Sequence, residues 1–183
     1  MPITRTVTLY EFDELSEEAQ EAALCSLCEI NVDHCWWDHI DCDAHDVGVK
    51  IEQFDIDHGT IKGRLNEYPV NVFKLIRKNH GKSCSTFKTA RSWLKEYCKV
   101  FKEWREEVER SPDDFADWSP KDWREEFDRT DEAGEIENDF LYDLLEDYRL
   151  MLKREYEYQT SEEQVAESIR ANGYLFNELG KIA

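Results

Sequence analysis

Thiol and imidazole side chains, which bind zinc readily, gather in one short stretch of the sequence. The stretch CSLCEINVDHCWWDHIDCDAH, residues 25–45, holds four of the six cysteines and three of the five histidines. If a helix starts near Trp36, three of these side chains fall on one stripe at positions i, i+4 and i+7. A fourth from the preceding helix would complete the tetrahedron that zinc prefers. The candidate ligands of such a structural zinc clamp are Cys35, His39 and Cys42, with Cys25 or Cys28 as the fourth.

The alternative interpretation is a set of free thiols. Structural zinc sites usually place their ligand pairs on turns, whereas these ligands fall on predicted helices. The stripe also alternates with Asp38, Asp41, Asp43 and Asp46, which is typical of a solvated acidic face. Six cysteines in an intracellular chain of 183 residues fit free thiols better than disulfides. We therefore predict neither a metal nor a cofactor.

Catalytic motifs give no support for an enzyme. The sequence has no G-x-S-x-G, Walker loop, H-E-x-x-H or dinucleotide-binding fingerprint. His58 and His80 fall at predicted turns, and carboxylates are so numerous that no pair stands out as acid and base. The sequence therefore favours a protein that acts by binding and has no catalytic residues.

Charge is segregated along the chain, whose formal net charge is −19. Residues 1–60 carry a net charge of −13 and residues 103–147 a net charge of −14. Between them, residues 61–102 carry +9, and the remaining tail is close to neutral at −1. A basic block therefore lies between two acidic blocks, which is a sharp asymmetry of charge along the chain.

The basic block contains a regular stripe of cations. On a helix of 3.6 residues per turn, steps of 3, 4, 4 and 3 residues keep five side chains on one face, while aromatic and aliphatic residues occupy the opposite face. This basic stripe consists of Lys88, Arg91, Lys95, Lys99 and Lys102. It either binds the phosphates of a nucleic acid, or faces water or the acidic segments of the chain itself.

The second acidic block suggests a different partner. Carboxylates on short helices can imitate the phosphate rows of a duplex and so attract the basic cleft of a nucleic-acid enzyme. They can equally serve only to keep the protein soluble. The candidate acidic surface consists of Asp113, Asp114, Asp117, Asp122, Glu125, Glu126 and Asp128.

The elements that would position these side chains are mainly helices. Serine caps, acidic first turns, prolines at first helical positions and glycine stops recur along the chain. The first predicted helix starts after Ser16. Further helices are predicted at about 36–47, 70–79, 85–110, 111–118 and 119–127, and a last one at 161–172. Before the last, a long helix is predicted with Phe140, Leu144, Tyr148 and Met151 on its inner face.

Alternating apolar and β-branched residues predict a small antiparallel sheet. The predicted strands are 6–12, 49–56 with a bulge near Gln53, 61–65 and 174–176. The expected fold class is α+β and predominantly helical. We expect an α+β body with a hairpin at 1–83, a helical subdomain at 84–160, and a C-terminal helix and strand at 161–183 that return to the body.

Three strings of sequence resemble a loose family of small acidic proteins encoded by bacteriophages and prophages. They are TVTLYEFDELSEEAQEAA, EINVDHCWWDHI and KREYEYQTSEEQVAESIRANGYLF, which lie at both ends of the chain. The resemblance implies a phage origin and a counter-defence role of the anti-CRISPR type. It assigns no binding residues, and the thiol positions are commonly filled by other residues in that family.

The leading functional hypothesis is a non-enzymatic inhibitor of a bacterial defence nuclease, an RNA-guided effector or its ribonucleoprotein, which binds through a DNA-mimicking acidic surface. The alternatives are a nucleic-acid-binding phage regulator that uses the basic stripe, or an antitoxin-like partner of a basic toxin. No apolar run is long enough for a membrane span and no signal peptide is evident, so we expect a soluble protein in the host cytoplasm. The aromatic-rich helices would also support a homodimer.

Overall fold

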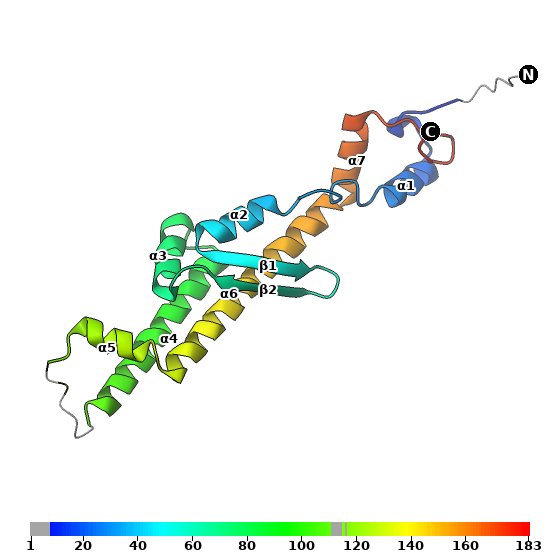
Figure 1. The fold of residues 1–183 in the computed structure, drawn as a ribbon. Helices are drawn as coiled ribbons and strands as arrows, with labels where there is room; N and C mark the ends of the chain where they lie inside the picture. Colours follow the sequence, from blue (N-terminus) through cyan, green and yellow to red (C-terminus); the bar gives the residue numbers. More distant parts are fainter. Residues whose placement is uncertain (1–7, 111–114, 116) are drawn as a thin grey trace, which may run out of the picture. The chain divides into compact units, whose positions relative to one another are not determined.

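The chain folds into two compact units. The structure, a computed structural model, describes residues 8–110, 115 and 117–183 (Figure 1). One unit combines the N-terminal part, up to Asp38, with Leu152–Ala183, and the other spans His39–Met151. Most described residues are helical and the sheet is a single antiparallel pair, which confirms the predicted α+β class. The units meet in sequence near residues 38 and 151, whereas the predicted segments divide at 83 and 160.

The first unit joins the two ends of the chain around a small core. It contains a 3-10 helix, η1 (Phe12–Glu14), and the helices α1 (Glu17–Ser26) and α7 (Glu162–Asn172). The predicted caps are present, since Ser16 accepts a hydrogen bond from the Ala19 amide and Ser161 accepts one from the Gln164 amide. The core residues are Phe12, Leu15, Ala19, Ala23, Val165, Ala166, Ile169 and Phe176.

The two predicted strands of this unit are wrong in the residues that the structure describes. Tyr10 and Phe176 exchange two backbone hydrogen bonds of 2.8 and 2.9 Å and form an isolated bridge. The pairing extends no further because the chain enters η1 at Phe12, whose ring packs edge-on against Phe176. Residues 6 and 7 of the predicted strand lie outside the described residues.

The second unit is built on a β-hairpin and the helices that follow it. Its strands are β1 (Val49–Asp55) and β2 (Thr60–Leu65), and the expected bulge lies between Ile51 and Gln53. The helices are α2 (Asp38–Asp46), α3 (Pro69–Asn79), α4 (Ser85–Val108), α5 (Pro120–Phe127) and α6 (Asp131–Gln159), of which α6 runs on into the first unit. The start of α2 falls two residues later than predicted.

The long helices pack through aromatic and aliphatic faces. On α6, Phe140, Leu144 and Tyr148 are buried as predicted, but Met151 is half-buried and Leu152 is buried in its place. Because Leu152 follows Tyr148 by four residues, it stays on the same helical face. Because this face of α6 is buried, the opposite side of the helix is the one available for contacts with other molecules.

Serine and proline start α5, as the sequence predicts. Ser119 and Asp122 form a reciprocal capping box, and Pro120 occupies the first helical position. The similar start signal at residues 111–112 lies outside the described residues, as do Asp113 and Asp114 of the candidate acidic surface.

Candidate interaction surface

The thiol and histidine stretch does not form the helical stripe that a zinc clamp requires. Helix α1 ends at Ser26, before Cys28, and α2 begins at Asp38, after Cys35. Cys25, Cys28, Cys35 and Cys42 are exposed free thiols. Over residues 8–110, 115 and 117–183, no three His, Cys, Asp or Glu side chains lie close enough together to hold a metal ion.

The basic stripe lies on α4 as predicted. All five of its side chains are exposed, whereas Thr86, Ala90 and Trp93 on the opposite face are buried. Two of the five pair with carboxylates of the same helix: Lys99 with Glu96 at 3.1 Å and Lys102 with Glu106 at 3.7 Å. The remaining three, Lys88, Arg91 and Lys95, border a shallow hollow together with Ser92, Leu94 and Cys98.

The described members of the candidate acidic surface are largely engaged in local contacts. Glu125 pairs with Lys121 at 3.2 Å and Glu126 with Arg129 at 2.9 Å. Asp122 caps α5, and this contact with Ser119 lowers the pKa of the Asp122 carboxyl. Asp128 accepts a hydrogen bond of 2.8 Å from the Tyr97 hydroxyl, and Asp117 is exposed. These acids therefore present less free charge than the sequence suggests.

A more continuous acidic row lies on α6, outside the predicted site residues. Residues 131–147 contain eight carboxylates and no lysine or arginine. Four exposed carboxylates follow one another at steps of 3, 4 and 4 residues, so they share one helical face. This α6 acidic row consists of Glu132, Glu135, Asp139 and Asp143.

The α6 acidic row is not neutralised within the described part of the chain, where no lysine or arginine forms an ion pair with any of its four members. Partial burial, followed by repulsion from Asp139 and Asp147, raises the pKa of Asp143. The row thus carries concentrated, unpaired negative charge. The same 3-4 spacing that identified the basic stripe could have revealed it in the sequence.

A partly buried polar network links α2, α4 and α6 in the second unit. The His80 Nδ1 lies 2.6 Å from the Thr86 hydroxyl, and its Nε2 lies 3.3 Å from an Asp43 oxygen. The other oxygen of Asp43 accepts a hydrogen bond of 3.0 Å from the Tyr148 hydroxyl. A hydroxyl, an imidazole and a carboxylate in this order resemble a nucleophilic triad. Thr86 is 0% exposed, however, so a substrate cannot reach its hydroxyl, and the network holds helices together.

Asp43→Asn is expected to remove a pH-dependent part of the stability. The His80 ring, assisted by the Tyr148 hydroxyl and opposed by partial burial, holds the pKa of Asp43 below its ordinary 3.8. The ionised carboxylate therefore stabilises the fold above that pH, and the contribution is lost as the pH falls through the folded pKa. The difference in free energy of unfolding between wild type and Asp43→Asn should shrink from about pH 5 to pH 2.

Urea unfolding at several pH values measures this difference. Asp41→Asn, an exposed change on the same helix, is the control and should show a smaller pH dependence. A wild-type advantage over Asp43→Asn that stays constant across this range would contradict the assignment.

Comparison of the chain with protein-family models, with curated proteins and with solved structures gives no match. Of the helices in the described part, none combines the length and the apolar character needed to cross a bilayer.

Proposed function

We propose that the protein is a phage-encoded, non-enzymatic inhibitor of a bacterial defence nuclease of the RNA-guided type, acting in the host cytoplasm. It binds the basic channel of the nuclease through a surface that imitates the charge of DNA. The observation that carries this proposal is the unpaired acidic row of α6.

The charge density along α6 supports DNA mimicry. The four members of the α6 acidic row are spread over about 17 Å of helix axis, at about 1.5 Å per residue. This is one carboxylate about every 5–6 Å on one face, within a factor of two of the one phosphate per about 3.4 Å along a DNA strand. A rigid helix also presents these charges without the entropy cost of ordering a flexible tail.

The separation of the two charge patterns also supports the proposal. The ion pairs of the basic stripe are made with glutamates of α4 itself, and no ion pair in the described residues joins the stripe to α5 or α6. The acidic row therefore remains available to a basic partner.

Capture of purified effectors tests the proposed function. The immobilised protein is challenged with a panel of RNA-guided nucleases, each alone, loaded with guide RNA, and bound to guide and target DNA. We expect retention of at least one effector without target DNA and loss of retention once target DNA fills the channel. Failure to retain any effector at about 150 mM salt, where charges still act over about 8 Å, would contradict the proposal.

A second candidate, a nucleic-acid-binding regulator, is favoured by one observation: Lys88, Arg91 and Lys95 surround a shallow hollow and form no ion pair in the described structure. Such a regulator would shift naked DNA or RNA in a gel, with an affinity that falls steeply with salt. Reversing the charge at Lys95 and Lys99 would abolish that shift. A DNA mimic would leave naked nucleic acid unshifted.

A further inference from the structure

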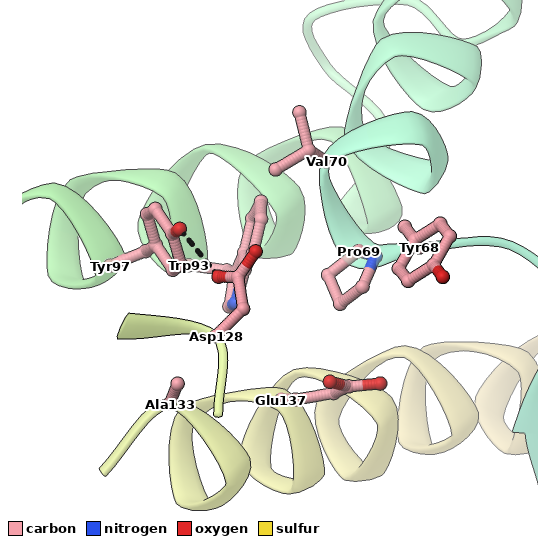
Figure 2. A pocket seen from close by; sticks show the side chains of 8 residues that line it. All are labelled: Tyr68, Pro69, Val70, Trp93, Tyr97, Asp128, Ala133 and Glu137. Carbon is pink, nitrogen blue, oxygen red and sulfur yellow. Dashed lines mark hydrogen bonds between the residues drawn. The ribbon is translucent and has the colours of Figure 1, made fainter. Parts of the chain in front are cut away.

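A small pocket opens in the second unit where the start of α3, the middle of α4 and the first turns of α6 meet the turn after α5 (Figure 2). Its volume is ≈ 190 Å³. Pockets for drug-sized ligands measure about 300–1,000 Å³, so this pocket suits a single side chain. The residues that line it include Tyr68, Pro69, Trp93, Tyr97, Asp128 and Glu137.

Aromatic rings form the fixed walls of the pocket. Trp93 is 6% exposed and stacks on Phe140, with ring centroids 4.6 Å apart. The Tyr97 ring lies 5.4 Å from that of Trp93. Tyr68, at the mouth, is 81% exposed, so its ring is free to cover an occupant. Aromatic faces attract a cation placed within about 6 Å of the ring centroid.

Two carboxylates supply the charge of the pocket, Asp128 from the turn after α5 and Glu137 from α6 (Figure 2). One oxygen of Asp128 accepts a hydrogen bond from the Tyr97 hydroxyl, which leaves the second oxygen to accept a hydrogen bond from an occupant of the pocket. No lysine or arginine in the described residues forms an ion pair with either carboxylate. Burial, and then the hydrogen bond to Asp128, raises the pKa of Tyr97, so its phenol stays neutral.

This combination of aromatic rings and free carboxylates suits a guanidinium group. A guanidinium is planar, stacks on aromatic faces and donates to carboxylates in a fork, whereas an ammonium offers only a point charge. The chain uses the same chemistry elsewhere: Arg170 lies 5.2 Å from the Phe12 ring centroid and donates to both oxygens of Asp13. We propose that the pocket binds an arginine side chain that a protein partner inserts.

If the partner that inserts the arginine is the defence nuclease, this inference rests on the proposed function. The channels in which nucleases hold nucleic acid are rich in arginine, so they could supply the side chain. The pocket itself is tested with a small probe that needs no partner. In a ¹⁵N NMR titration of the full chain with N-acetyl-arginine amide, the indole N–H signal of Trp93 should shift and saturate. N-acetyl-citrulline amide, which has the same shape but no charge, should produce no shift.

Variants locate the binding. Asp128→Asn removes the charge but keeps an oxygen for the Tyr97 hydroxyl, and Glu137→Gln removes the second charge. Each should weaken the binding of arginine amide by at least about threefold. Glu103→Gln, an exposed change on α4 outside the pocket, should leave the binding of arginine amide unchanged.

The outcomes separate the pocket from the proposed function. Arginine amide that binds while no effector is captured would overturn the nuclease proposal and leave the pocket. Equal shifts with the citrulline and arginine amides, or binding that Asp128→Asn and Glu137→Gln leave unchanged, would overturn the pocket.

Discussion

Replacing Phe127 with alanine is expected to lower the free energy of unfolding of the second unit by about 3–5 kcal/mol, as for other buried phenylalanines. Phe127 is the last residue of α5 and is 0% exposed. Its ring centroid lies 5.3 Å from those of Tyr97 and Phe101 and 5.4 Å from that of Trp104. The truncation would leave a cavity between α5 and α4, because the three remaining rings cannot close it.

Urea unfolding followed by tryptophan fluorescence measures this loss. Tyr142→Ala is a suitable control, because Tyr142 is 70% exposed and its removal should cost less than about 0.5 kcal/mol. A loss below about 1 kcal/mol for Phe127→Ala would show that α5 is not held against α4 as the structure describes.

Elements with strong local signals could be predicted from the sequence. The caps at Ser16, Ser119 and Ser161 each lie at the start of a helix, and Gly173 ends α7 with the left-handed φ of 64° that favours glycine. The hairpin and its bulge follow from alternation and turn residues at 49–65. These features depend on neighbours a few positions away, so a local pattern is enough to locate them.

Features that depend on distant segments could not be predicted in the same way. The strand-like alternation around Tyr10 gives only one bridge to Phe176, because the chain enters η1 at Phe12. The network of Asp43, His80 and Tyr148 joins segments far apart in the chain. The predicted zinc ligands do not share one helical stripe, because α1 ends at Ser26, before Cys28, and α2 begins at Asp38, after Cys35.

The site residues show the same limits. The basic stripe could be predicted because its spacing is regular within one helix. In the second acidic block, predicted site residues such as Asp122 and Glu126 cap a helix or form a local ion pair, and the sequence pattern does not reveal these contacts. The pocket lined by Tyr68 and Glu137 forms only when α3, α4 and α6 pack together, so no local sequence pattern predicts it.

Neutralising the α6 acidic row is expected to slow association with a captured effector by about 10- to 100-fold at low salt. The variant carries Glu132→Gln, Glu135→Gln, Asp139→Asn and Asp143→Asn, all exposed changes that preserve size. The difference from wild type should nearly vanish at about 1 M salt, where the Debye length falls to about 3 Å. Association rates from surface plasmon resonance over a salt series give this comparison.

The matched control removes four charges from the other unit. It carries Glu21→Gln, Glu29→Gln, Glu167→Gln and Glu178→Gln, which are also exposed. Both variants have the same net charge, so a general effect of charge would slow them equally. Equal slowing would contradict a specific role of α6.

Displacement of DNA is the most direct test of the claim that an effector binds the α6 acidic row in place of DNA. Labelled target DNA competes with the protein for a guide-loaded effector that the protein retains, and fluorescence anisotropy reports the bound DNA. The account predicts that wild type and the control variant release the DNA, that added DNA reverses this effect, and that the α6 variant releases little. Simultaneous binding of protein and DNA, with anisotropy unchanged at saturating protein, would contradict it.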